Sequence, residues 1–158
     1  MGVAGSGKTT IGAKLSAATG IPFFDADDFH PPANKEKMKA GEPLNDDDRK
    51  DWLSTINILA KEQSQKSGAI IGCSALKEKY RIILSYEIKT PVHWILLQGS
   101  FGLIQKRMKA RKDHFMPASL LQSQFDTLET PGYAVVMDIK NDPDEIVADI
   151  LKLVKFNG

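Results

Sequence analysis

The chain has 158 residues, of which 42% are hydrophobic and 26% charged, a balance typical of one compact globular domain. Its 21 basic and 20 acidic residues leave a net charge of +1, which gives no general reason to expect nucleic acid or a membrane surface as a partner. A single cysteine, Cys73, excludes an intrachain disulfide and agrees with a reducing compartment. No apolar run approaches the roughly 20 residues of a membrane span, and the glycine-rich start lacks a signal-peptide core. We therefore expect a cytoplasmic protein.

Short apolar runs alternate with helical patterns along the chain, which is typical of α/β units around a parallel sheet. The expected strands cover residues 21–24, 69–73, 92–97 and 134–139. The expected helices cover residues 8–18, 33–40, a long segment that begins after Asn45 or Asp46, and then 77–85, 100–111, a segment ending at 128, and 144–156. The pattern predicts a single α/β domain over residues 1–158.

The strongest motif is GVAGSGKT at residues 2–9, which matches G-x-x-x-x-G-K-[ST] at every position. Its glycines let the backbone curl so that successive N–H groups face one phosphate, and the following helix directs its positive end at the same anion. The motif predicts ATP as a ligand, with the Lys8 charge on the β- and γ-phosphates and the Thr9 hydroxyl on Mg²⁺. The expected ATP-binding residues are Gly2, Val3, Ala4, Gly5, Ser6, Gly7, Lys8, Thr9 and Thr10.

A phosphate-binding loop of this type normally follows a strand, whereas only Met1 precedes it here. The first strand of the sheet is therefore apparently missing from the sequence, and we expect that strand in the middle of the sheet. A folded, active form should carry an apolar segment of about five residues before Met1, because buried strand edges need partners. Without it, we expect another segment in that slot or a disturbed loop.

Two carboxylates, Asp25 and Asp27, end the strand expected at residues 21–24. Residues spaced two apart on a strand point to one side, so both carboxylates should face the phosphate loop. This placement predicts Asp25 near Mg²⁺ and Asp27 as the acceptor of a proton from a substrate hydroxyl. An acidic turn that only caps the next helix is the alternative. The chain lacks the N-K-x-D signature of GTPases.

Five further segments resemble the gluconokinase family in family order. They are DADDFHP (25–31), GEPLNDDDR (41–49), CSALKEKYR (73–81), RMKARKDHFM (107–116) and LQSQFDTLE (121–129). The resemblance implies a P-loop NTPase three-layer sandwich with a parallel sheet, an acceptor-binding region at about 25–60 and a small lid at about 111–125. It also implies transfer of the γ-phosphate of ATP to the 6-hydroxyl of D-gluconate, a small-molecule substrate, and a possible homodimer.

The resemblance also implies roles for residues on the acceptor side. Asp27 and His30 suit the substrate hydroxyls, although a purely structural His30 before the following prolines stays open. Arg49, Lys77 and Arg81 are the cations expected around the carboxylate, since charge-assisted hydrogen bonds are the strong ones. Lys77 and Arg81 lie four residues apart, which places them on one face of the helix expected at 77–85. A solvated surface charge is the alternative for each cation.

Three residues near the lid complete the implied site. Arg107 is expected to stack on adenine, and Arg111 to reach the transferring phosphoryl group when the lid closes. His114 is expected to contact phosphate or substrate. A basic turn at the end of a helix is the alternative for the two arginines, because the helix dipole favours cations there.

Two other functions share parts of this sequence pattern. A shikimate-type or nucleoside-monophosphate-type kinase shares the phosphate loop, the carboxylates and the lid, so only the matched segments and the acceptor-side cations favour gluconate. A non-catalytic ATP-binding regulator is the second alternative. The intact set of Lys8, Thr9, Asp27 and Arg111 favours an enzyme.

Overall fold

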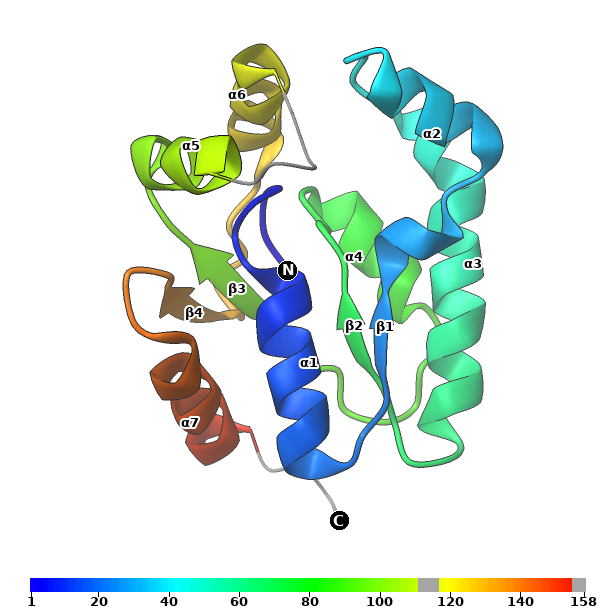
Figure 1. Cartoon of the computed structure of the whole chain (residues 1–158). Coiled ribbons are helices and arrows are strands. Elements are labelled where there is room, and N and C mark those ends of the chain that lie inside the picture. The colour runs from blue at the N-terminus through cyan, green and yellow to red at the C-terminus, as the bar shows by residue number, and fades with distance from the viewer. Residues whose placement is uncertain (111–116, 155–158) are drawn as a thin grey trace.

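A computed structural model describes residues 1–110 and 117–154 (Figure 1). Its strands are β1 (Phe23–Asp25), β2 (Ile70–Gly72), β3 (Ile95–Gln98) and β4 (Val135–Asp138). Its helices are α1 (Lys8–Thr19), a 3-10 helix η1 (Ala26–Phe29), α2 (Pro32–Lys39), α3 (Asp46–Ser64), α4 (Glu78–Ser85), α5 (Phe101–Ala110), α6 (Ala118–Thr127) and α7 (Pro143–Leu153). The paired strands run parallel, so the expected α/β class is confirmed.

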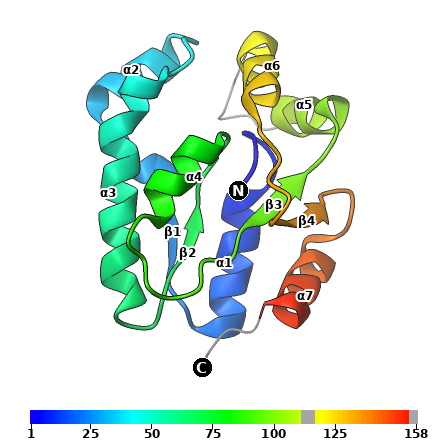
Figure 2. The ribbon, with the colours of Figure 1, turned by 180° about the vertical axis from the view of Figure 1, so that it is seen from behind.

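The strands form the middle of three layers. Helices α1 and α7 pack together on one side, and α3 and α4 pack together on the other. Helix α1 lies in front of the strands in Figure 1, whereas α4 lies in front of β1 and β2 when the molecule is seen from behind (Figure 2). Helices α5 and α6 lie beyond the carboxyl ends of the strands, beside the amino end of α1.

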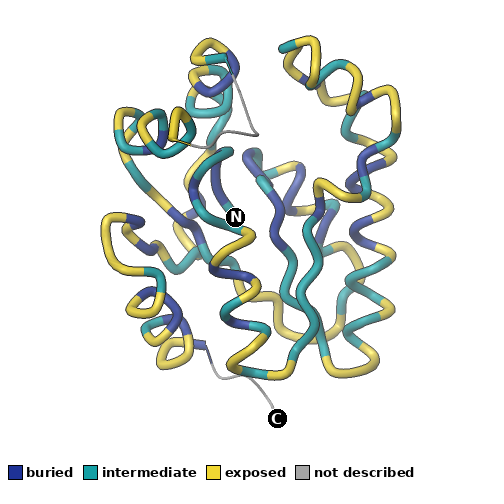
Figure 3. The backbone as a smooth tube through the Cα atoms, in the orientation of Figure 1, coloured by how far each residue is buried: buried dark blue, intermediate teal, exposed yellow. Residues whose placement is uncertain are grey.

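Local sequence signals explain where the longer helices begin. Asn45 caps α3 in a capping box with Asp48, and Asp142 caps α7 in the same way with Glu145. Helices α3 and α7 turn their apolar stripes toward the strands, so that their buried residues lie on the inner sides (Figure 3). Within residues 1–110 and 117–154, no helix combines the length and the apolar character that a membrane crossing requires.

The strands form two separate two-stranded sheets. One pairs β1 with β2, and the other pairs β3 with β4. Within the described part of the chain no strand joins β2 to β3, and Met1 lies between them (Figures 1 and 2). The Met1 α-amino group donates to the Ile95 carbonyl (2.5 Å), and the Leu97 N–H donates to the Met1 carbonyl (2.9 Å). The expected gap in the middle of the sheet is therefore present.

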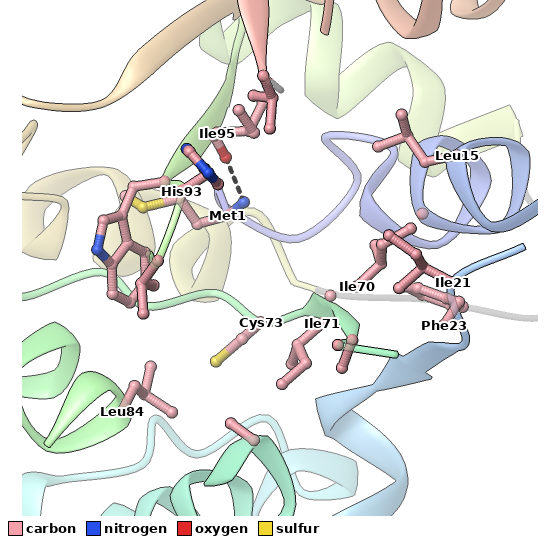
Figure 4. A pocket seen from close by; sticks show the side chains of 18 of the residues that line it. Met1, Leu15, Ile21, Phe23, Ile70, Ile71, Cys73, Leu84, His93 and Ile95 are labelled. Atoms are coloured by element: carbon pink, nitrogen blue, oxygen red, sulfur yellow. Dashed lines mark hydrogen bonds between the residues drawn. The ribbon is translucent and has the colours of Figure 1, made fainter. Parts of the chain in front are cut away.

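A cavity of about 600 Å³ occupies this gap (Figure 4). Its walls include the apolar side chains of Leu15, Ile70, Ile71 and Ile95. Burial lowers the pKa of the Met1 α-amino group to about 5. We expected another segment in this slot or else a disturbed phosphate loop, and a segment from outside this chain stays a prediction. In this chain the slot is a cavity. The start of the loop is held by the hydrogen bonds of Met1 to β3 and by that of the Gly2 N–H to the Ser74 carbonyl, just after β2.

Joining an extended apolar segment of about five residues to the amino end should stabilise the fold. The segment would pair with the facing edges of β2 and β3 and fill the cavity. We expect a gain of about 2–5 kcal/mol, by analogy with core cavities. That gain corresponds to a melting temperature higher by roughly 5–20 °C in a chain of this size. Differential scanning calorimetry measures the change.

The control is an extension of equal length with proline and aspartate at alternate positions, which can neither pair nor bury its side chains. Equal melting temperatures for the two extended proteins would show that the cavity does not accept a strand.

Candidate active site

The phosphate loop is built from residues 2–9 and runs into the amino end of α1. Gly5 has a φ of 74°, and a Cβ at this position would lie 2.7 Å from Cγ of Met108 on α5. A Cβ at Gly2 would lie 2.7 Å from the Leu97 carbonyl oxygen. The loop can therefore pass this close to α5 and β3 only with glycine at these two positions.

Lys8 and Thr9 lie where the motif predicts them. The Lys8 ammonium group donates to the carbonyl oxygens of Gly2 (3.1 Å) and Val3 (3.0 Å), so its charge spans the loop. The Thr9 hydroxyl donates to Oδ2 of Asp25 (2.7 Å) at the end of β1. A hydroxyl and a carboxylate are hard oxygen ligands that suit Mg²⁺, which commonly binds through one or two such groups plus substrate phosphates. Among the described residues no group of three or more His, Cys, Asp or Glu side chains could hold a metal ion.

A pocket of about 270 Å³ adjoins the phosphate loop. Its walls come from the phosphate loop and the start of α1, η1, the connection between α2 and α3, α3 itself, the turn after β2, and α6. The polar side chains that line it are Lys8, Asp27, His30, Glu42, Asn45, Asp46, Arg49, Ser74, Lys77, Ser123, Gln124 and Thr127. The wall carries both acidic and basic side chains, which suits a small polar ligand.

Asp27 lines the pocket from η1, so its expected position on the strand was wrong. The chain leaves β1 at Asp25, whose side chain accepts from the Asp27 N–H (3.1 Å) and caps the 3-10 turn. The acidic-turn alternative is thus also correct, because Asp25 caps this turn while it contacts Thr9. The two carboxylates still lie on the side of the sheet where the phosphate loop is found.

His30 combines a packing role with a place in the pocket wall. Its ring stacks on Trp52 with centroids 4.1 Å apart, and its Nε2 lies 3.8 Å from Oδ1 of Asp27. Burial, followed by the nearby charges of Arg49 and Lys35, lowers the pKa of His30 to about 4. The imidazole is therefore neutral near pH 7 and can offer one donor and one acceptor.

Arg49 on α3 and Lys77 at the start of α4 both line the pocket, and both lie near the ring of Tyr80. The Arg49 guanidinium donates to the Leu44 carbonyl and lies 5.5 Å from the centre of the Tyr80 ring. The Lys77 ammonium donates to Oδ1 of Asp46 (3.1 Å) and lies 5.6 Å from the same centre. Two of the three cations expected on the acceptor side are therefore brought together.

Arg81 is placed elsewhere, and the helix face that it was expected to share with Lys77 does not form. Helix α4 begins at Glu78, and Lys77 is its N-cap in extended conformation (φ −105°, ψ 151°). Arg81 is only 2% exposed and does not line the pocket. Its guanidinium donates to the Ala75 carbonyl (2.7 Å) and to the Glu78 carboxylate (2.7 Å).

The lid residues are described only in part. Arg107, near the end of α5, donates from Nη2 to the Ile139 carbonyl (2.6 Å), so it ties α5 to the segment after β4. Its contact with adenine stays a prediction. Arg111 and His114 lie outside the described residues.

Sequence reasoning assigned no role to Gln124 or Asp46, which both line the pocket. Oε1 of Gln124 accepts from the Ala4 N–H (2.7 Å) and so links α6 to the phosphate loop. Asp46 accepts from Lys77, Lys79 and Tyr80, and these bonds hold the pKa of its carboxyl well below its usual range. Both residues belong to segments that carried the family resemblance, and Asp46 was interpreted only as a cap or charge at a helix start.

Comparison with known proteins gives a consistent result. The shikimate kinase family profile matches residues 4–155. A probable gluconokinase of Dictyostelium discoideum is 47% identical over 98% of this chain and 84% of its own length. The thermoresistant gluconokinase of Escherichia coli K12 is 41% identical over 98% of this chain and 91% of its own. The crystal structure of a gluconokinase from Sinorhizobium meliloti 1021 superposes with a TM-score of 0.86 at 40% identity, over 96% of this chain and 87% of that one.

The buried imidazole of His30 should make stability depend on pH. Its folded pKa of about 4 lies below the usual value of 6.5, so the unfolded chain binds more protons between these pH values. The free energy of unfolding should therefore rise with pH across this window, by at most about 1.4 kcal/mol per unit from this group. Urea unfolding at pH 4.5, 5.5 and 6.5 measures the slope, which His30→Gln should reduce.

The exposed His93 provides the matched control, because His93→Gln should leave the slope as it is in the unmodified protein. An unchanged slope in His30→Gln would show that His30 is not the group responsible.

Proposed function

The chain belongs to the gluconokinase family of P-loop kinases, and we propose that it transfers the γ-phosphoryl group of ATP to the 6-hydroxyl of D-gluconate. One observation supports this most directly. The phosphate loop with Lys8 opens onto a pocket of about 270 Å³ that holds a carboxylate, Asp27, and two cations, Arg49 and Lys77. A polyol that carries a carboxylate needs acceptors for its hydroxyls and fixed cations for its charge.

The proposed chemistry is a direct in-line displacement. The oxygen of the 6-hydroxyl bonds to the γ-phosphorus, the bond from that phosphorus to the β–γ bridging oxygen breaks, and ADP leaves. The proton of the hydroxyl passes to Asp27, which also orients the attacking oxygen. Lys8 lies across the loop, where it can stabilise the charge that develops on the transferring oxygens. We assign the same task to Arg111 on the basis of the family resemblance.

Thr9 and Asp25 would hold Mg²⁺, which would neutralise charge on the β- and γ-phosphates. In their described positions the two side chains bond to each other, so a hydroxyl and a carboxylate are already close together beside the loop. We further propose that Arg107 contacts the adenine and that His114 approaches the substrate from the lid.

On the acceptor side, we assign the gluconate carboxylate to Arg49 and Lys77 and the hydroxyls to Asp27 and His30. The neutral imidazole suits a hydroxyl, which can donate to the unprotonated ring nitrogen or accept from the protonated one. Arg81 is not included, because its guanidinium is buried away from the pocket. A homodimer and a cytoplasmic location remain predictions.

A coupled assay for ADP release tests the function against its nearest rivals. The panel is D-gluconate, shikimate, other sugar acids and nucleoside monophosphates, with ATP alone as the blank. We expect release above the blank with gluconate and a kcat/KM for gluconate higher than for any other acceptor. Preference for shikimate or a nucleotide would overturn the substrate, and no release with any acceptor would favour the regulator.

Lys8→Ala should lower kcat by about 10²–10³-fold or more, because the lost charge acts on the transferring phosphoryl group. Steady-state kinetics at saturating ATP and gluconate measures the effect, and the melting temperature verifies folding. Lys14→Ala is the matched control, since Lys14 lies on the same helix but pairs with Asp144 at the surface. A folded Lys8→Ala protein with near-normal turnover would remove Lys8 from the mechanism.

Lys77→Met should raise the KM for gluconate roughly 10- to 150-fold, the equivalent of one charge-assisted hydrogen bond, and leave the KM for ATP nearly unchanged. Lys79→Met is the matched control, because Lys79 also bonds to Asp46 but does not line the pocket. Equal changes in the KM values for gluconate and ATP, or no change in either, would contradict the assignment of Lys77 to the gluconate carboxylate.

A further inference from the structure

The turn formed by residues 74–77, here called the 74–77 turn, joins the phosphate loop to the acceptor pocket. It follows β2, and the Gly2 N–H of the phosphate loop donates to the Ser74 carbonyl (3.2 Å). Ser74, Leu76 and Lys77 all line the pocket. The conformation of this turn therefore decides where the Lys77 ammonium lies relative to the transferring phosphate.

The 74–77 turn contains a strained residue. Ala75 has a φ of 46°, in the left-handed region that side chains with a Cβ avoid. It is also buried, at 1% exposure. Left-handed non-glycine residues persist where their surroundings hold them, and they concentrate at functional sites.

The group that holds the turn is the Arg81 guanidinium. Nη1 donates to the carbonyls of Ala75 (2.7 Å) and Leu76 (3.3 Å), and Nη2 and Nε both donate to Oε2 of Glu78 (2.7 and 3.0 Å). Nε also donates to the Tyr133 hydroxyl (3.0 Å). A planar fork of donors can bind two successive carbonyls and a carboxylate together, which a lysine ammonium cannot match.

The same network reaches the end of α6. Glu129, two residues beyond that helix, donates its N–H to the Leu76 carbonyl (2.8 Å). Its carboxylate accepts from the Glu78 N–H (2.6 Å) at the start of α4. The turn is thus fixed from three sides, by the phosphate loop, by Arg81 and by the segment that leaves α6.

We propose that Arg81 is a positioning residue, which acts on phosphoryl transfer by holding the 74–77 turn, and through it Lys77 and the phosphate loop, in one conformation. This rests on the proposed function. Contact with a substrate carboxylate would require Arg81 to leave Ala75, Leu76 and Glu78 and to cross the buried turn. That would remove the Arg81 donor from the carbonyl of the buried Ala75, which is costly.

Arg81→Met tests the proposal in the complete protein. We expect kcat/KM to fall roughly 10- to 100-fold, with kcat lowered as well as the KM for the acceptor raised, because the turn touches both sites. The acceptor is whichever member of the panel the unmodified protein phosphorylates best. Lys61→Met is the matched control, because Lys61 has the same kinds of neighbour, Glu87 and the Tyr86 ring, far from the pocket.

Ala75→Gly in the Arg81→Met background provides the decisive measurement. Glycine adopts the left-handed conformation without steric cost, so the turn should depend less on Arg81. We expect the double variant to regain roughly 5- to 30-fold of the lost kcat/KM. If Arg81 instead contacted the substrate directly, Ala75→Gly could not restore that contact. The proposal would be overturned if the double variant recovered no kcat/KM and if Arg81→Met changed only the KM for the acceptor.

Hydrogen exchange gives a readout independent of activity and serves also if Arg81→Met folds poorly. In Tyr133→Phe, which keeps the buried charge, the Glu78 and Glu129 amides should exchange faster while the Ile11 amide on α1 does not. Unchanged exchange at both amides would show that the network does not hold the turn. The unmodified protein could also be inactive with gluconate while Tyr133→Phe still makes these amides exchange faster. In that case the proposed substrate is wrong, and the positioning role of Arg81 is tested with the acceptor that the protein does phosphorylate.

Discussion

The arrangement of the site depends on holding the N–H groups of the phosphate loop in place before a phosphate binds. Hydrogen-bond donors that must first reorganise stabilise a phosphate less. The loop is fixed from several directions. Gly2 bonds to the turn after β2, Ala4 bonds to Gln124 on α6, and Gly5 packs against α5. The Lys8 ammonium group also holds the loop, because it donates hydrogen bonds to the carbonyl oxygens of Gly2 and Val3. Two of these neighbours, the turn after β2 and helix α6, are also walls of the pocket.

The parallel arrangement of the strands makes this convergence possible. Parallel strands end at the same edge, so Asp25 at the end of β1 and Ser74 just after β2 reach the phosphate loop without long excursions. The two sheets do not pair with each other within the described residues. Helix α1 connects them, because it contacts β1 and β2 on one side and α7 on the other, while Met1 bonds to β3. The amino end of α1, where phosphate is expected, therefore lies at the junction of both halves.

The sequence predicted best those features that a few neighbouring residues determine. The loop, Lys8, Thr9 and the contact with Asp25 follow from a motif whose local backbone is nearly fixed by its glycines. Arg81 was misplaced because helix α4 begins at Glu78, one residue later than the pattern indicated, so Lys77 is extended and shares no helix face with Arg81. Its true partners are backbone carbonyls of the 74–77 turn, and a left-handed alanine leaves no sign in the sequence.

The charges in the pocket bear on how the proposed site would bind two anions, the triphosphate of ATP and the carboxylate of the acceptor. Lys8, Arg49 and Lys77 are balanced there by Asp27, Glu42 and Asp46, so the pocket carries no large net field. Asp46 already accepts from Lys77, and an acceptor carboxylate must therefore gain its affinity from well-placed hydrogen bonds rather than from general attraction. The triphosphate of ATP, in contrast, would meet the amino end of α1 and the Lys8 ammonium group. Under the proposed assignments, selectivity for the acceptor would depend on geometry, and the position of Lys77 would depend on the turn that Arg81 contacts.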